Sequence, residues 1–135
     1  MTLPELMVVL MGWAHTTSGL PLPAKIPDVQ VVPASVMSHL ACGDRPCKVM
    51  GWFPPGKTVY LNETLLPLEN TYSSSIVVHE LVHYLEQESG KWPTPYSCPD
   101  ALQMEYIAYG AQRDFLTAYG EYIPVGLAMA DAHCS

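Results

Sequence analysis

The hydrophobic positions at the start of the chain follow a helical period. Apolar residues recur at intervals of three and four over residues 3–14, which is typical of an amphipathic helix. Thr2 can cap this helix because Glu5 follows three residues later, and Gly19 is a typical end. The apolar run at residues 6–13 also resembles the core of a signal peptide, but no Lys or Arg precedes it. We therefore expect a folded helix of a mature chain, from which any export signal has been removed.

Further along, short β-type runs give way to two long helical patterns. The expected elements are a strand at 29–32, a helix at 34–40, strands at 47–53 and 58–61, and helices at 73–88 and 100–119. The Pro-Pro-Gly-Lys turn at residues 54–57 favours an antiparallel hairpin. Ser73 or Ser74 can cap the first long helix, and Pro99 opens the second. The order predicts a single α+β domain over residues 1–135 with a small antiparallel sheet.

Composition narrows the classes of function. Hydrophobic residues make up 49% of the chain and charged residues 14%, which excludes intrinsic disorder. The net charge is −7, and the six basic residues are scattered, so we expect no nucleic-acid partner. No apolar run approaches the roughly 18 residues of a membrane span, so we expect no membrane span either. The sequence does not indicate an oligomeric state.

Four cysteines in a chain of 135 residues allow three pairings of two disulfides. Cys42 and Cys47 enclose a short loop with a Gly and a Pro to turn it, while Cys98 precedes a predicted helix and Cys134 lies beside the C-terminus. We expect the pairs Cys42–Cys47 and Cys98–Cys134, and hence an extracytoplasmic protein, secreted or periplasmic. The alternative is four reduced thiols in a cytosolic protein.

The segment with the clearest chemistry is His79-Glu80-Leu81-Val82-His83, in the middle of a predicted helix. Two His four residues apart lie on one helix face, where both rings can reach one metal ion. Glu80 lies beside that face, and it can take a proton from a water on the metal. This is the zinc metalloprotease motif. The alternative is a solvent-facing His pair, which the surrounding apolar residues disfavour.

A catalytic zinc site usually has three protein ligands. Glu105 fits the third position, because it lies 22 residues after His83 on the next predicted helix. Ala108 shares the face of Glu105 and lets the two helices approach closely. Asp100 and His133 are the alternative third ligands.

The residues after the motif exclude one other class of metalloprotease. That class has a Gly three residues after the second His and a further His three residues beyond. Here these positions are Glu86 and Ser89. We expect Glu86 and Glu88 to form the solvated end of the helix.

Together, the motif and the later segment Glu105-Tyr106-Ile107-Ala108 resemble the gluzincin clan of zinc metallopeptidases. The chain is similar in size to the single-domain minigluzincins, and it resembles small bacterial proteins of unassigned function that carry a His-Glu-Leu-Val-His helix. The specific match covers residues 73–112. The resemblance implies a zincin-like fold, in which an edge strand of the sheet pairs with an extended peptide or protein substrate.

The resemblance also implies the roles of the site residues. His79, His83 and Glu105 would bind one Zn²⁺, and Glu80 would be the general base and acid. Thermolysin-type relatives place an Asp four residues after the ligand Glu to orient a zinc-bound His, and here that position is Tyr109.

Attack of water on a peptide carbonyl places negative charge on the carbonyl oxygen. A neutral hydrogen-bond donor should stabilise this oxyanion. Tyr109 is the candidate because it shares the face of Glu105, and Tyr96, Tyr119, Tyr122 and His133 are the alternatives.

The predicted function is that of a zinc-dependent peptidase. The first alternative is a catalytically weak metal-binding pseudoenzyme or peptide-binding module of the same fold. The second is a zinc hydrolase that acts on a non-peptide amide.

Overall fold

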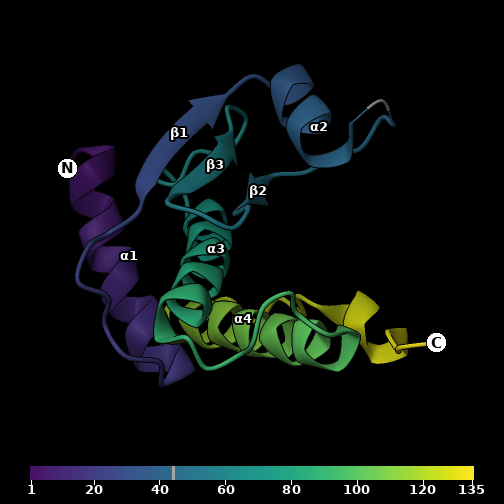
Figure 1. Cartoon of the computed structure of the whole chain (residues 1–135). Helices are drawn as coiled ribbons and strands as arrows, with labels where there is room; N and C mark the ends of the chain where they lie inside the picture. Colours follow the sequence, from purple (N-terminus) through teal and green to yellow (C-terminus); the bar gives the residue numbers. More distant parts are fainter. Residues whose placement is uncertain (44) are drawn as a thin grey trace.

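The computed structural model describes residues 1–43 and 45–135 (Figure 1). Within these residues the chain forms four α-helices, three strands and one 3₁₀ helix, so the predicted α+β class is confirmed. In chain order the elements are α1 (Leu3–Ser18), β1 (Asp28–Val32), α2 (Ala34–Cys42), β2 (Gly51–Trp52), β3 (Thr58–Asn62), α3 (Thr71–Ser89), α4 (Cys98–Ala118) and η1 (Leu127–Asp131). No helix in the described ranges has the length and apolar character needed to cross a membrane.

Helix α1 forms as its sequence predicts. The Thr2 side chain accepts a hydrogen bond from the Glu5 backbone, and the Glu5 carboxylate accepts one from the Thr2 backbone, which completes a capping box. Gly19 ends the helix with φ 75°, a left-handed conformation that favours glycine. The residues that α1 buries lie on one stripe: Leu6, Met7, Leu10, Met11 and Ala14. This N-terminal segment is therefore part of the folded core.

The sheet is mixed rather than antiparallel, which corrects the prediction. Its strand order is β1-β3-β2, and the expected hairpin is present because β2 pairs antiparallel with β3. However, β1 pairs with β3 in parallel, with Val29 opposite Val59. The long connection between these strands contains α2 and β2, and a crossover of this kind permits parallel pairing. The turn signals alone predicted only the hairpin.

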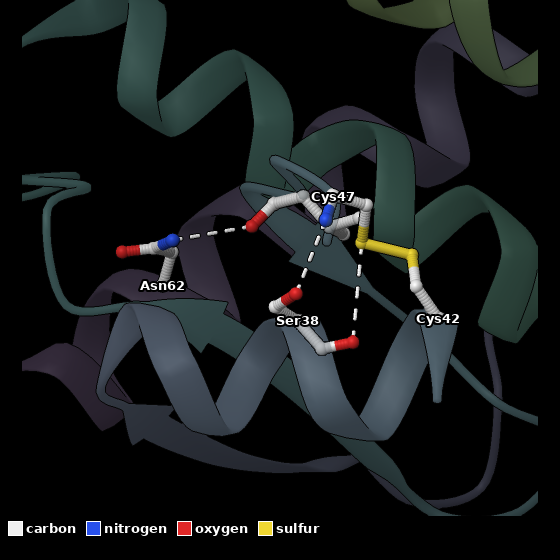
Figure 2. The surroundings of a disulfide bond; sticks show 5 residues. Ser38, Cys42, Cys47 and Asn62 are labelled. Atoms are coloured by element: carbon white, nitrogen blue, oxygen red, sulfur yellow. Dashed lines mark hydrogen bonds between the residues drawn. A yellow bond between two sulfur atoms is a disulfide. The ribbon is translucent and has the colours of Figure 1, made fainter. Parts of the chain in front are cut away.

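Strand β2 is shorter than the predicted run at residues 47–53, because the start of that run is bound to other elements (Figure 2). The Cys42–Cys47 disulfide joins it to the end of α2, and the Cys47 backbone N–H donates to Ser38 Oγ at 3.2 Å. The Asn62 side chain at the end of β3 donates to the Val49 carbonyl at 3.2 Å.

The second predicted disulfide, Cys98–Cys134, joins the start of α4 to the C-terminal segment. Both predicted pairings are therefore confirmed. Two disulfides are compatible with an extracytoplasmic location.

Helix α3 lies between the sheet and α4, and it also packs against α1 (Figure 1). It begins at Thr71, two residues earlier than predicted, because Asn70 rather than Ser73 or Ser74 is the cap. The Asn70 side chain accepts from the Ser73 N–H at 2.8 Å, while the Ser74 hydroxyl donates to a preceding loop carbonyl. Most of α3 is buried, and its buried residues include the polar side chains of His79, Glu80 and Glu86.

Candidate metal centre

Three side chains from two helices converge at the middle of α3. His79 and His83 lie one turn apart, with their Nε2 atoms 3.2 Å from each other. Glu105 of α4 places Oε2 3.4 Å from His79 Nε2 and Oε1 2.5 Å from His83 Nε2. A metal ion can be held by one ligand atom from each residue, since these atoms lie within 4.8 Å of one another.

The donor set fits a zinc ion. Two imidazoles and one carboxylate are ligands that zinc prefers at a catalytic site. Tetrahedral coordination with Zn–N distances near 2.0–2.1 Å places neighbouring ligand atoms about 3.3 Å apart. Two of the three separations, 3.2 and 3.4 Å, are close to this value. The helices can approach so closely because Ala108 and Ala111 of α4 are small and almost fully buried.

Each imidazole is oriented through its other nitrogen. His79 Nδ1 donates to Gln112 Oε1 at 3.1 Å, and the Gln112 amide in turn donates to Ser75 Oγ at 3.1 Å. His83 Nδ1 donates to Glu86 Oε1 at 2.6 Å. Because Nδ1 carries the proton in both rings, Nε2 is the nitrogen that can face a metal. The His79 ring is therefore held by Gln112 and not by the residue at position 109.

Glu86 corrects the expectation of a solvated helix end. Its exposed fraction is only 1%, and within the described chain Oε2 has no hydrogen-bond partner. The pKa of Glu86 is raised by burial, which outweighs the hydrogen bond from His83. The signal that identifies Glu86 is its spacing, since residues three apart on a helix can pair. No comparable spacing identifies Gln112, because it lies on another helix.

We expect Glu86→Gln to weaken zinc binding by about 10–100-fold, the usual effect of removing a partner of a metal-bound His. The amide keeps the size of the side chain but loses the charge that fixes the His83 ring. Zinc affinity would be measured by competition with a chelator. Glu88→Gln, an exposed acid two residues later, is the matched control and should bind zinc normally. Equal affinities for the two variants would show that Glu86 does not support the ligand.

Glu80 lies beside the three ligands and is buried, with an exposed fraction of 8%. Burial raises the pKa of its carboxyl, which the neighbouring His79 and His83 partly oppose. Strand β2 passes directly over it. A Cβ on Gly51 would lie 3.0 Å from Glu80 Cγ and 3.4 Å from Glu80 Oε2. A buried carboxylate of raised pKa next to a metal site is well suited to accept and return a proton.

Tyr109 lies against the first ligand. Its ring centroid is 4.4 Å from that of His79, in an edge-on arrangement. Burial raises the pKa of the Tyr109 hydroxyl, and the carboxylates of Glu105 and Glu80 raise it further. The hydroxyl therefore keeps its proton and can donate a hydrogen bond.

The alternative candidates for the oxyanion donor and for the third metal ligand lie in different parts of the structure. Tyr96 lines the same cleft as the ligands. Tyr119 packs on Trp13 instead, and Tyr122 is 81% exposed. Among the described residues, neither Asp100, in the first turn of α4, nor His133, bonded to a nearby backbone carbonyl, belongs to the convergent group.

In the metal-free chain at neutral pH, His83 carries a second proton, on Nε2, which faces the Glu105 carboxylate. Burial lowers its pKa, but hydrogen bonds to Glu105 and Glu86 outweigh burial and raise the pKa to about 10. The same contacts hold the pKa of the Glu105 carboxyl well below its usual range, despite burial. His83 gains the partners Glu105 and Glu86 only on folding, so its protonation stabilises the folded state. This contribution to the free energy of unfolding is fully present below the ordinary pKa of His. It is lost as the pH rises through about 10.

A metal ion must displace the His83 proton, so binding should release it. We expect the apparent zinc affinity of the chain to rise by about tenfold per pH unit between about pH 7 and pH 9. Competition with a chelator, corrected for protonation of the chelator, measures this slope. An affinity independent of pH over that interval would show that His83 is already unprotonated.

The site lies where two cavities meet. The larger has a volume of about 490 Å³ and the smaller about 300 Å³. Both are lined by Gly51, His79, Glu80 and Tyr109. The larger cavity also has an apolar wall, which comprises Trp52, Phe53, Pro55, Tyr96 and Met104. Among the residues described as lining either cavity there is no Lys or Arg. The convergent side chains of His79, His83 and Glu105 are thus accessible to a molecule that extends to both sides of them.

Comparison of the chain with protein-family models, with curated proteins and with solved structures found no significant match.

Proposed function

We propose that this protein is a zinc-dependent peptidase with a zincin-like fold, as its resemblance to the gluzincins implies. The observation that carries the proposal is the convergence of His79, His83 and Glu105 at the junction of two cavities, with Glu80 beside them. Orientation of both imidazoles by Gln112 and Glu86 supports it, because a metal site depends on such partners.

The residues of the chain have separate roles in this proposal. His79, His83 and Glu105 hold the ion, which when bound supplies Lewis acidity and lowers the pKa of water. Glu80 accepts the proton of the attacking water and returns it to the leaving amine. The Tyr109 hydroxyl donates a hydrogen bond to the oxyanion that develops on the scissile carbonyl. Burial of Glu80 lowers the local dielectric constant and strengthens its electrostatic interactions.

Strand β2 supports a peptide as the substrate. One of its edges pairs with β3, and β2 together with Phe53 lines the larger cavity. An extended peptide can add as a further strand to the other edge of β2, which does not pair with β3. It would be held there by backbone hydrogen bonds, which do not depend on the sequence of the peptide. The apolar wall offers a place for a large apolar side chain of that peptide. This arrangement favours a peptide over the small non-peptide amide of the alternative hypothesis.

We expect cleavage of internal peptide bonds. The two cavities can accommodate a peptide on both sides of Glu80, and their described lining contains no Lys or Arg to bind a terminal carboxylate. A peptide acetylated and amidated at its ends should be cut as fast as the same peptide with free ends. Mass spectrometry of the products would measure this. Removal of terminal residues only, with the blocked peptide intact, would contradict it.

The experiment that tests the whole proposal is peptide cleavage by zinc-loaded protein with and without a chelator. Cleavage that the chelator abolishes and added zinc restores supports a peptidase. Stable zinc binding without any turnover supports instead the metal-binding or peptide-binding module. We further propose that the protein acts outside the cytoplasm, where its two disulfides would persist.

A further inference from the structure

The chain that follows α4 returns along the same helix. We refer to residues 121–134 as the C-terminal strap. It runs from the end of α4 back to the start, where Cys134 is bonded to Cys98 (Figure 1). The strap contains the 3₁₀ helix η1, which has no buried residue. Tyr122 and Leu127 are 81% and 70% exposed, so little apolar burial holds the strap in place.

The contacts of the strap follow one stripe of α4. Arg113 Nη1 donates to the Val125 carbonyl at 3.1 Å, and the Tyr106 hydroxyl donates to the Met129 carbonyl at 2.9 Å. Tyr109 lies between Arg113 and Tyr106 on this stripe, at helical spacings of four and three residues. The strap therefore crosses the helix at the residue whose ring lies against His79.

Gly126 is the residue of the strap that contacts Tyr109. A Cβ built on Gly126 would lie 2.7 Å from Tyr109 Cγ and 2.9 Å from Tyr109 Cβ, closer than real contacts allow. Gly126 also has φ +81°, which side chains rarely adopt. Val125 and Gly126 line the smaller cavity together with Tyr109 and Gln112. The Tyr109 ring is thus held between the strap and His79.

We propose that Gly126 positions Tyr109 for its role at the site, and that the Cys98–Cys134 disulfide keeps the strap in this position. The inference rests on the proposed function for the role of Tyr109 as oxyanion donor. With the disulfide closed, the ring stays beside His79 and the smaller cavity keeps its wall. With the disulfide open, few contacts restrain the strap, so Tyr109 gains freedom and the hydroxyl loses its fixed place.

The test compares two double variants of the full chain. Cys98→Ser with Cys134→Ser opens the strap, and Cys42→Ser with Cys47→Ser opens the other disulfide as the matched control. We expect the first pair to lower kcat at least tenfold with its zinc content unchanged, and the control to keep wild-type kcat. In a Tyr109→Phe background, opening the strap should have no further effect on kcat, because the coupled residue is gone.

Gly126→Ala is the second arm, and it leaves both disulfides intact. It should lower kcat because the added methyl group displaces the strap or the ring. A spectroscopic readout is independent of turnover: 3-fluorotyrosine placed at position 109 should change its ¹⁹F shift when the strap disulfide is opened, but not in the control. An unchanged shift and an unchanged kcat in both arms would overturn the inference. If the zinc-loaded wild-type chain cleaves no peptide, the proposed function fails, and the ¹⁹F shift alone decides whether the strap positions Tyr109.

Discussion

Replacing Glu80 with Gln is expected to lower kcat for peptide cleavage by about 10²–10⁴-fold, the usual contribution of a general base and acid. The amide has the shape of the carboxylate and fits beneath Gly51, but it cannot accept the proton of the attacking water. Zinc content should be unchanged, because Glu80 is not one of the three convergent ligands. The measurement is kcat for a peptide substrate, with the bound zinc determined on the same sample.

Glu88→Gln is the matched control for this experiment, since it makes the same change at an exposed position of α3. It should leave kcat at the wild-type value. If Glu80→Gln kept wild-type turnover while Glu88→Gln also did, Glu80 would not be the proton acceptor. If Glu80→Gln lost zinc as well as turnover, Glu80 would be a ligand rather than a neighbour of the metal.

Replacing Glu105 with Ala is expected to remove the third ligand. Loss of an orienting partner lowers metal affinity by about 10–100-fold. The zinc affinity of Glu105→Ala should fall further than that, because a direct metal contact is lost. Peptide cleavage should fall with it at limiting zinc. The two imidazoles would also lose the carboxylate that neutralises the proton on His83 in the metal-free chain. Zinc titration by calorimetry would measure the affinity.

Asp100→Ala and His133→Ala are the controls for Glu105→Ala, because the sequence alone leaves both residues open as third ligands. The structure places neither in the convergent group of the described residues, so both variants should bind zinc as the wild-type chain does. Weak binding by either of these variants, together with normal binding by Glu105→Ala, would move the third ligand to that residue.

The hydrogen bonds that orient the His79 and His83 rings affect whether the proposed site can hold a metal ion. A His ligand without an orienting partner can rotate, and its affinity for metal falls. Position 109, where thermolysin-type relatives have an orienting Asp, is Tyr in this chain. Gln112 on the next turn of α4 supplies a hydrogen bond in its place, and Ser75 fixes the Gln112 amide. Position 109 is occupied instead by Tyr, whose ring lies against His79.

Several features of this protein could be predicted from the sequence because they depend on residues close together along the chain. The Thr2–Glu5 capping box and the β2–β3 hairpin each depend on short-range spacing. The four-residue interval between His79 and His83 puts both rings on one side of any helix. The two disulfides could also be predicted from the sequence, since the four residues between Cys42 and Cys47 include a Gly and a Pro that favour a turn, which leaves the other two cysteines to pair.

The tertiary structure alone decided the features that join distant residues. Parallel pairing of β1 with β3 depends on the path of the crossover, which no local pattern encodes. Glu86 looked like a solvated acid because helical spacing does not show which neighbours cover a residue, yet packing buries it against His83. The contacts of Gln112 with His79 and of Gly126 with Tyr109 depend on how α4 and the strap dock. Local spacing fixes which side chains share a helix face, whereas packing of whole elements fixes what that face meets.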